Sequence, residues 1–482
     1  MVMIYSKLLL CLHLFLIFTT TLVESYIGIS WGRMARQRMI PSMVVDMLLQ
    51  NGVPEVKLYT TSRNVLEAFA GTNIGVTITM PNDDLGTITG KYEIKYITVG
   101  SQPFSSTYFN KTYYEAVDVL KYFQTVLKED EYFSSRNIKA TMSHFTDILK
   151  EVKNPSEGDF RLEIKDYMIR SCQLLYEDNA PVWLDIFPIY NVKRLFNNDL
   201  EFAFFNNNST STFMDGNYRY NNIFEVMHDT FVHALRKGRI YNLTIIIGQV
   251  GWPTDGLDGA NITNAQRFHK GFIQHIMNGK GTPLHPSPID AYIHSLSDES
   301  KLNIIRGGFI RHWGIYKFDG KPKYDIDFSG RNRDIKPVTG KGITHMPKRW
   351  CVFNNIETVD VEKKLKVLYE KACNESDCTS MEPGGSCSNL EFPHNISYAF
   401  NMFFQSKSQK VDEEGCDFDG FGKIVPDDPS TEKCLFPVEI LSAELYGGSG
   451  ILFVGSGIRH IVGYEIIISL SLFLTFFVLN LY

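Results

Sequence analysis

Cysteine is the residue type whose spacing most directly indicates chemistry in this chain. Six of the eight cysteines lie near the C-terminal end: Cys351, Cys373, Cys378, Cys387, Cys416 and Cys434. An even set in one short segment predicts three disulfides that cross-link a module whose own core is small. Structural zinc is the alternative, but the segment has no CxxC pair and no closely spaced histidines. The spacing leaves the connectivity open; among the possible pairs we expect Cys351–Cys416.

The N-terminal end indicates an oxidising compartment, where disulfides persist. Lys7 precedes an apolar run from Leu8 to Phe18 and a small, polar stretch, which together predict a cleaved secretory signal over residues 1–25. A membrane-spanning anchor is the alternative, and the apolar run is short for a bilayer. Asn-x-Ser/Thr sequences are glycosylation acceptors on secreted surfaces. They occur at Asn110, Asn207, Asn208, Asn242, Asn261, Asn374 and Asn395.

The C-terminal end predicts a lipid anchor. Small residues around Ser456 are followed by a spacer and by an apolar run that continues to the last residue without a basic flank. That order is typical of a glycosylphosphatidylinositol signal, with a stalk over 438–457, Ser456 as the anchor residue and 458–482 removed. A single spanning helix is the alternative. Both interpretations place the protein on the outer face of the plasma membrane, next to the cell wall.

The chain between these ends alternates strand-like and helix-like segments. Apolar, β-branched runs predict eight strands: YIGISWG, VKLYT, IGVTITM, IKYITVG, IKATMSHF, VWLDIFP, LTIIIGQVGWP and RHWGIYKF. Segments between them, such as 43–52, 113–129 and 264–279, have apolar residues three and four apart, which is the pattern of amphipathic helices. Alternation at this length predicts an α/β fold, a (β/α)8 TIM barrel over 26–342, rather than an open doubly wound sheet.

Amino-acid composition and the stretches without helical or strand periodicity indicate the class of protein and the remaining domain boundaries. The chain has 482 residues, a net charge of -6 and 44% hydrophobic residues, so it is globular and lacks the basic surface that nucleic acid requires. A stretch rich in Pro, Gly and Lys predicts a linker over 343–349. The six-cysteine module then occupies 350–437. Cys172 stands apart in a helix-like stretch and is expected to be a buried apolar side chain.

Several long motifs in the barrel segment resemble glycoside hydrolase family 17, the plant endo-β-1,3-glucanases. The motifs are IGISWG, VGSQPF, FAFF, GQVGWPTDG and FIRHWGIY, where the family has VGNEPF, GETGWPT and FERHWGLF at the second, fourth and fifth. The cysteine segment, with WCVFN, PGGSC, SYAFN, CDFDG and KCLFP, resembles the carbohydrate-binding module of family 43. The resemblance implies a retaining glycosidase barrel followed by a small disulfide-rich α+β module that binds carbohydrate.

The two residues that the resemblance implies as catalytic are not acids here. The acid/base position of VGNEP is Gln102, and the nucleophile position of GETGWP is Gln249. A retaining mechanism needs one carboxylic acid and one carboxylate, and an amide can neither exchange a proton near neutral pH nor attack efficiently. A third family glutamate is replaced by Ile310, while Asp298 and Glu299 keep part of an acidic segment whose lysine is displaced to Lys301. Lost or much reduced hydrolysis is therefore expected.

The resemblance also implies where a glucan chain would bind. Glutamine is nearly isosteric with glutamate and keeps its hydrogen-bonding atoms, so binding without cleavage is expected. Side chains expected at the cleft are Tyr59, Phe187, Phe204, Phe205, Trp252, Trp313 and Glu299. Burial in the core is the alternative for each aromatic one.

Two functions stay open from the sequence. The first is a monomeric protein that binds β-1,3-glucan (callose) at the cell surface through barrel and module, without cofactor or metal. The second is an active glucan endo-1,3-β-glucosidase that uses a substitute carboxylate, with Asp185 after the sixth strand as the best candidate and Glu299 as another.

Overall fold

The computed structural model of this chain describes residues 25–80, 93–106, 113–205, 212–356, 361–411 and 415–441. Outside this part lie all of the predicted signal but its last residue, the predicted anchor residue Ser456 with the tail around it, and Asn110, Asn207 and Asn208. Of the other predicted glycosylation sites, Asn242, Asn261 and Asn374 are exposed and Asn395 is half-buried.

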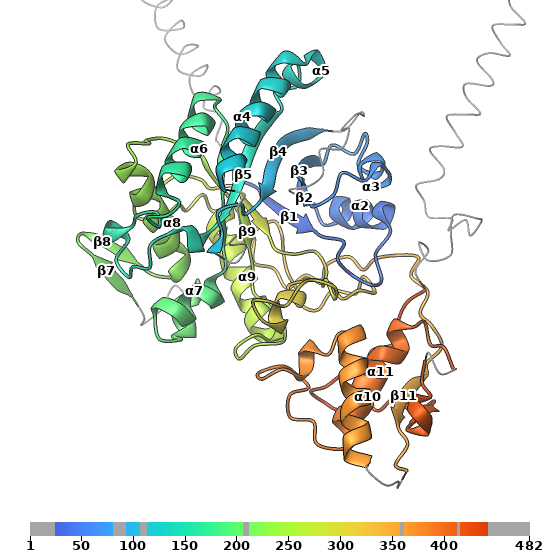
Figure 1. The fold of residues 1–482 in the computed structure, drawn as a ribbon. Helices are drawn as coiled ribbons and strands as arrows, with labels where there is room; N and C mark the ends of the chain where they lie inside the picture. The colour runs from blue at the N-terminus through green and yellow to red at the C-terminus, as the bar shows by residue number, and fades with distance from the viewer. Residues whose placement is uncertain are drawn as a thin grey trace, which may run out of the picture.

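Eight parallel strands close into a barrel in the order β1-β10-β9-β6-β5-β4-β3-β2 (Figure 1). They are β1 (Ile27–Trp31), β2 (Glu55–Leu58), β3 (Gly75–Met80), β4 (Ile94–Ser101), β5 (Lys139–Phe145), β6 (Val182–Ile186), β9 (Ile245–Val250) and β10 (Ala291–Ile293). Pairing of β1 with β10 closes the ring. The predicted (β/α)8 fold is therefore confirmed.

The closing strand is not the one that the sequence predicted. The prediction of a strand over 311–318 is wrong, because Ala291–Ile293 takes that place and 311–318 contributes only isolated bridges at Tyr316. The last strand has to lie between β9 and β1, and the chain returns there directly after the helix that follows β9. Because β10 is only three residues long, it lacks the apolar run that marks the other strands.

Helices surround the barrel (Figure 1). They are α2 (Pro41–Gln50), α3 (Arg63–Ala68), α4 (Tyr113–Glu129), α5 (Glu131–Ser134), α6 (Lys165–Glu177), α7 (Pro188–Leu195), α8 (Ile223–Lys237) and α9 (Ile262–Met277). The connections include η2 (Thr146–Ile148), η3 (Pro155–Glu157), η4 (Leu200–Ala203), η5 (Gly308–Arg311) and a hairpin of β7 (Phe213–Asp215) and β8 (Tyr218–Tyr220). The three predicted amphipathic helices correspond to α2, α4 and α9.

Local sequence explains where these helices begin and end. The side chain of Asn261 caps α9 by accepting a hydrogen bond from the Asn264 N–H. Beyond the other end of α9, Gly279 has a φ of 65°, a left-handed conformation that glycine adopts without the steric cost of a Cβ. Cys172, within α6, is a free and fully buried cysteine, as expected.

The interior of the barrel contains charged side chains. The ammonium of Lys57 on β2 lies 4.9 Å from the ring centre of Trp183 on β6, a strand on the opposite side of the ring. Side chains alternate along a strand, so Val56 and Leu58 point the other way, toward the helices. The chain thus buries an aliphatic layer outside the sheet and a partly polar layer inside it.

The C-terminal module has its own core and three disulfides. Its elements are β11 (Trp350–Phe353), α10 (Val361–Glu375), η6 (Thr379–Met381), α11 (His394–Ser406), η7 (Phe418–Gly420) and β12 (Gly422–Val425), with β11 and β12 antiparallel. The disulfides are Cys351–Cys416, Cys373–Cys378 and Cys387–Cys434. The expected pair Cys351–Cys416 is therefore present. In the core, the rings of Phe400 and Phe418 stack with centroids 3.7 Å apart.

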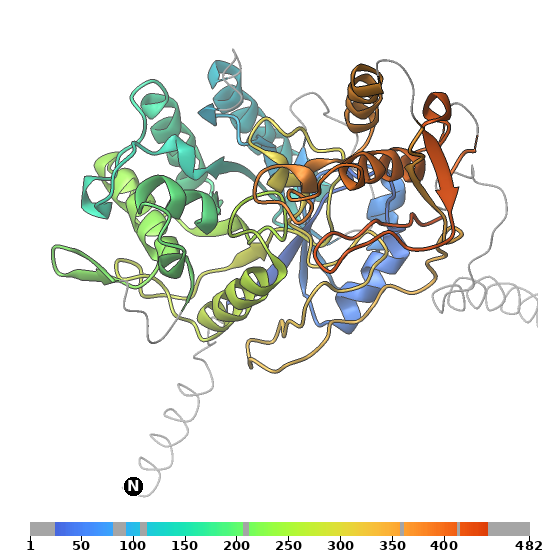
Figure 2. The same ribbon diagram turned by 90° about the horizontal axis from the view of Figure 1, so that it is seen from below.

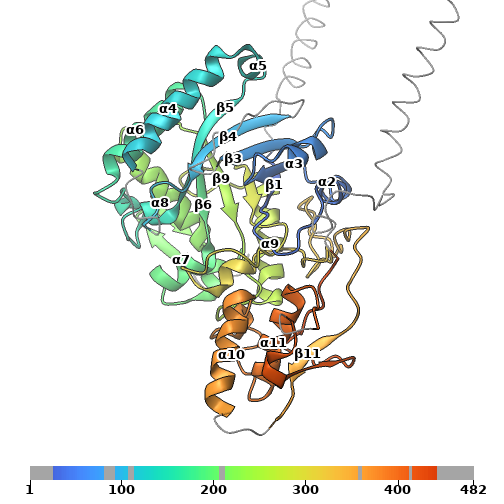
Figure 3. The ribbon, with the colours of Figure 1, turned by 45° about the vertical axis from the view of Figure 1, so that its right-hand side comes forward.

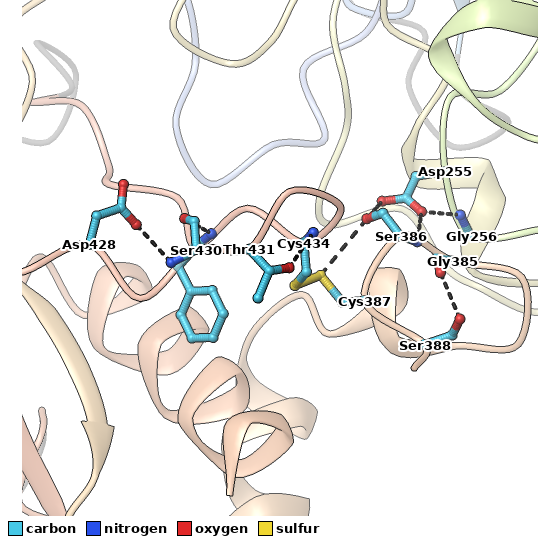
Figure 4. The surroundings of a disulfide bond; sticks show 11 residues. Asp255, Gly256, Gly385, Ser386, Cys387, Ser388, Asp428, Ser430, Thr431 and Cys434 are labelled. Atoms are coloured by element: carbon cyan, nitrogen blue, oxygen red, sulfur yellow. Dashed lines mark hydrogen bonds between the residues drawn. A yellow bond between two sulfur atoms is a disulfide. The ribbon is translucent and has the colours of Figure 1, made fainter. Parts of the chain in front are cut away.

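The module lies against one side of the barrel (Figures 1 and 3) and, seen from below, beside the yellow segments that follow β9 and β10 (Figure 2). Asp255, after β9, accepts hydrogen bonds from the N–H (2.6 Å) and hydroxyl (2.7 Å) of Ser386 beside the Cys387–Cys434 disulfide (Figure 4). Two further contacts join Gly308 N to Glu382 at 2.8 Å and Arg311 to Asp377 at 3.1 Å.

The expected linker and stalk run side by side rather than extending away. His345 in the linker pairs with Ile440 in an isolated bridge, and the N–H of Ile440 donates to Gln37 Oε1 at 2.6 Å. Residues 438–441, at the start of the expected stalk, therefore pack between barrel and module. The rest of the expected stalk, from 442, lies outside the described residues.

Candidate functional site at the barrel mouth

The two glutamines that the sequence singled out lie at the C-terminal ends of barrel strands. Gln102 directly follows β4 and Gln249 lies within β9, and their exposed fractions are 7% and 8%. Gln102 has a φ of 54°, a conformation that costs about 1 to 3 kcal/mol for a residue with a Cβ. Strain of this kind clusters at functional sites, and here it directs Gln102 toward the barrel axis.

Gln102 belongs to a buried network centred on Asp185. Its Nε2 donates to Asp185 Oδ2 at 2.7 Å, and Ser143 Oγ lies 3.1 Å from both carboxylate oxygens. Lys57 Nζ completes the network 3.9 Å from Asp185 Oδ1. Burial raises the pKa of Asp185, against the opposing effects of Lys57, Gln102 and Ser143. Burial likewise lowers the pKa of Lys57, against the charge of Asp185.

Gln249 and Glu299 belong to the other half of the mouth. Gln249 Nε2 donates to the Tyr59 hydroxyl, across the ring from β9 to the end of β2. Burial raises the pKa of Tyr59 well above its usual value, and the nearby charges of Asp185 and Glu299 raise it further. The hydroxyl of Tyr59 is therefore neutral and available as a hydrogen-bonding group beside Gln249.

Glu299 is a second buried carboxyl group. Its Oε1 accepts a hydrogen bond from Met34 N at 2.9 Å, and burial raises its pKa to about 7 despite that bond. A Cβ on Gly32 would lie 2.0 Å from the same oxygen, so a larger residue there would displace the Glu299 carboxyl group. The neighbouring Asp298 pairs with Lys323 at 2.7 Å, while the expected Lys301 is exposed. Ile310 is half-buried.

This arrangement has hydrogen-bonding capacity but no carboxylate at either strand-end position. Asp185 is fully buried, and its oxygens are already engaged by Gln102, Ser143 and Lys57. A nucleophile has to reach the reacting carbon, and a general acid has to reach the leaving oxygen. The mouth can therefore orient hydroxyl groups of a sugar, whereas Asp185 is poorly placed to act as a substitute nucleophile.

Only some of the predicted aromatic side chains lie at the mouth. Phe187, after β6, has its ring centre 4.7 Å from that of Trp313 and 5.6 Å from that of His294. Tyr59 is half-buried beside Gln249. Of these side chains, Tyr59 contacts Gln249, while Phe187 and Trp313 pack on each other with exposed fractions of 9% and 4%.

The prediction that Phe204, Phe205 and Trp252 line the cleft is wrong. Trp252 is fully buried, and its indole N–H donates to Gly259 O at 3.0 Å. Phe204 is 1% exposed and lies against Trp252, while Phe205 packs on rings of α8 and α9. These side chains fill the layer between barrel and helices, because a buried ring contributes more by packing there than by lining a wet groove.

Several residues of the site were missed by the sequence reasoning. Lys57 gave a signal, since it is a lysine within the apolar strand VKLYT, and a charge in a buried strand needs a partner. Ser143 and Arg306 gave none, because their roles depend on neighbours far away in the chain. Arg306 donates to Ser105 Oγ at 2.6 Å, from a segment 201 residues further along the chain.

The described part of the chain contains no group of three or more His, Cys, Asp or Glu side chains placed to hold a metal ion. Within the same ranges, no helix combines the length and the apolar character that crossing a membrane requires.

Comparison with known proteins identifies both domains. Residues 27–328 match the model of glycosyl hydrolases family 17, and residues 349–423 match the X8 domain. The chain is 34% identical over 463 residues to glucan endo-1,3-beta-glucosidase 5 of Arabidopsis thaliana, covering 91% of this chain and 93% of that protein. It is 35% identical over 442 residues to glucan endo-1,3-beta-glucosidase 8 of the same plant, covering 86% and 90%.

A solved structure resembles the barrel. CJP38, a beta-1,3-glucanase and allergen of Cryptomeria japonica pollen, superposes with a TM-score of 0.59 at 26% identity. The superposition covers 63% of this chain and 99% of CJP38, so the solved relative corresponds to the barrel without the module.

Proposed function

Because the chain belongs to glycosyl hydrolase family 17 and carries an X8 domain, we propose that it binds β-1,3-glucan without hydrolysing it. The observation that carries the proposal is that the two strand-end positions, Gln102 and Gln249, hold amides fixed by hydrogen bonds. General acid catalysis alone is worth about 10² to 10⁴ in rate, and without a nucleophile the retaining pathway is absent.

The mouth supports binding because its polar groups are fixed before a ligand arrives. Gln102, Gln249 and Tyr59 combine hydrogen-bond donors and acceptors at the ends of their strands. Preorganised groups lose little conformational entropy on binding. The X8 domain supplies a second place on the same chain where carbohydrate would bind, and two linked sites raise the apparent affinity by avidity.

We also place the protein at the outer face of the plasma membrane, held by a glycosylphosphatidylinositol anchor at Ser456. The support is the order of small residues, spacer and terminal apolar run in the sequence. Phosphatidylinositol-specific phospholipase should release the protein from intact cells. Retention in the membrane after complete digestion would argue for a spanning helix instead.

The decisive experiment restores both carboxyl groups in one variant. Wild type, Gln102→Glu, Gln249→Glu and the double variant are assayed for reducing ends released from laminarin. We expect background rates from the wild type and both single variants, and measurable hydrolysis from the double variant. At position 102, a glutamate would lie next to Asp185, and repulsion between two carboxylates favours keeping a proton between them, as a general acid requires.

Gln266→Glu serves as the matched control, because Gln266 on α9 bonds the backbone of Asp325 away from the mouth. Glucan binding is measured in parallel by co-sedimentation with insoluble β-1,3-glucan, with cellulose for comparison. Hydrolysis by the wild type that disappears in Asp185→Ala or Glu299→Gln would overturn the proposal in favour of an active enzyme. Absence of glucan binding in all variants would overturn it in favour of another ligand.

A further inference from the structure

The side-chain amides of Gln102 and Gln249 are each bonded to the protein through their nitrogen. Gln102 Nε2 donates to Asp185 Oδ2 at 2.7 Å, and Gln249 Nε2 donates to the Tyr59 hydroxyl. No group in the described ranges bonds the carbonyl oxygen Oε1 of either side chain, and neither oxygen is buried. The mouth therefore presents amide oxygens to a ligand at both strand-end positions.

Asp185 determines which end of the Gln102 amide faces outward. Its carboxyl group is fully buried and is surrounded by donors, because Ser143 Oγ lies 3.1 Å from both oxygens and Lys57 Nζ lies 3.9 Å from Oδ1. A carboxylate accepts hydrogen bonds and donates none. Turning the amide round would place Gln102 Oε1 against Asp185 Oδ2, two acceptors with no proton between them. The nitrogen of Gln102 is thus held inward and its oxygen outward.

Gln249 provides a comparison within the same mouth. Its partner is the hydroxyl of Tyr59, and a tyrosine hydroxyl can donate a hydrogen bond as well as accept one. Either end of the Gln249 amide can therefore face Tyr59, whereas only the nitrogen of Gln102 can face the carboxylate of Asp185. The partner fixes the direction of the amide at position 102 and leaves it adjustable at position 249.

We propose that Asp185 is a positioning residue for sugar recognition, which holds Gln102 so that its carbonyl oxygen accepts a hydrogen bond from a hydroxyl group of the glucan. A sugar hydroxyl has one hydrogen to donate and also has lone pairs that accept. At position 102 the mouth recognises the hydrogen and not the lone pairs. This recognition rests on the proposed glucan binding and names the contact that supports it.

The test compares full-length wild type, Asp185→Asn and Gln102→Ala, with Asp229→Asn as the control. Asparagine at position 185 keeps the size of aspartate but can donate as well as accept, so it no longer fixes the Gln102 amide. Asp229 is also fully buried and accepts a hydrogen bond from Leu284 N at 2.8 Å, but it lies on α8, outside the sheet. Its substitution removes a buried carboxyl group without touching the mouth.

The ligands are laminaritriose and derivatives in which one hydroxyl group at a time is replaced by fluorine, which cannot donate. The wild type should bind at least one derivative about tenfold more weakly than laminaritriose, because an acceptor in the mouth then loses its donor. Asp185→Asn should lose most of that penalty, since Nε2 of Gln102 can turn toward the sugar. Gln102→Ala should lose it as well, and Asp229→Asn should keep it. The module is the same in all four proteins, so a difference between them reports the mouth.

The direction of the amide is measured separately, by nuclear magnetic resonance without glucan. In protein isotopically labelled at glutamine nitrogen, the signals that are missing from Gln102→Ala identify the Gln102 side chain. The N–H that bonds Asp185 should exchange with water slowly in the wild type and in Asp229→Asn, and faster in Asp185→Asn. Fast exchange in the wild type would overturn the positioning role, and this result does not depend on whether Asp185→Asn folds.

The remaining outcomes separate this proposal from the proposed function. Equal fluorine penalties in the wild type and Gln102→Ala would overturn the contact between Gln102 and the sugar. Faster exchange in Asp185→Asn with unchanged penalties would overturn the role of Asp185 in recognition. A wild type that does not bind laminaritriose would overturn glucan binding and the recognition built on it, while the exchange rate would still report whether Asp185 holds the amide.

Discussion

Two regions lie on the same rim of the barrel: the mouth, and the contact between the barrel and the C-terminal module at Asp255. Their buried polar groups find hydrogen-bond partners in different ways. In the mouth, partners come from other strands of the barrel, as Asp185 receives hydrogen bonds from Gln102 and Ser143. At the contact, Asp255 receives its bonds from Ser386 in another domain. The mouth is thus complete within the barrel, whereas the neighbouring rim depends on the module.

The electrostatics of the two regions differ accordingly. In the mouth, burial dominates and raises the pKa of Asp185 and that of Glu299, the latter to about 7. At the contact, burial also raises the pKa of Asp255, but His312 and hydrogen bonds from Ser386 outweigh it and the net pKa is lowered. One region therefore disfavours negative charge on its carboxyl groups and the other stabilises it.

The largest effect is expected from breaking the network in the mouth. Asp185→Ala leaves Lys57 buried without its partner, and loss of one member of a buried ion pair costs about 3 to 5 kcal/mol. Urea denaturation should show this as a lower free energy of unfolding. Asp185→Ala combined with Lys57→Met should recover part of the loss, since no charge then stays buried. Equal losses in the single and double variants would contradict a charge-based cost.

Removing a disulfide tests the other side of the comparison. For Cys387→Ala/Cys434→Ala, whose cysteines are 47 residues apart, loop-closure entropy predicts a loss of about 4 kcal/mol from the module. The matched variant Cys373→Ala/Cys378→Ala opens a separation of only 5 residues, so about 2 kcal/mol is expected. Limited proteolysis of the module measures both. Similar losses in the two variants would show that chain entropy does not account for most of the stabilisation.

Most of the fold followed from the sequence because the strands of a parallel barrel are buried on both faces. Such strands appear as apolar runs, and seven of the eight were found that way. The eighth, Ala291–Ile293, was missed because three residues carry too little pattern, while the apolar run around Trp313 packs against Phe187 without entering the sheet.

The site was predicted less completely, for a physical reason. Gln102 and Gln249 were placed at the mouth correctly because both lie at the C-terminal end of a predicted strand, where active sites of such barrels are built. No comparable positional rule predicts where the aromatic residues near those motifs lie. Phe204, Phe205 and Trp252 pack outside the sheet. The position of Arg306 depends on its contact with Ser105, 201 residues away in the chain, which no local pattern encodes.

The pH dependence of stability separates the mouth from the contact. Because the folded protein raises the pKa of Glu299 from 4.5 to about 7, folding favours its protonated form. The corresponding stability is present below pH 4.5 and is lost as the pH rises toward 7, by about 3 kcal/mol at 1.36 kcal/mol per unit. In Glu299→Gln this slope should be flatter than in the wild type. Parallel curves between pH 4.5 and 7, measured by urea denaturation, would contradict the assignment.

The smallest effect is expected at the contact between the domains. Asp255→Ala removes the acceptor for two hydrogen bonds from Ser386, and bonds to a charged group at a partly exposed site are worth about 1 to 2 kcal/mol here. The loss should appear as faster proteolysis of the linker 343–349, with little change in unfolding of the barrel itself. The stability that the Asp255 carboxylate contributes depends on pH in the opposite direction to that of Glu299. Because folding lowers the pKa of Asp255, this stability is present above pH 3.8 and is lost on acidification. Asp258→Ala, an exposed neighbour on the same segment, is the control. If both variants open the linker equally, the contact depends on the backbone path of the segment and not on the carboxylate of Asp255.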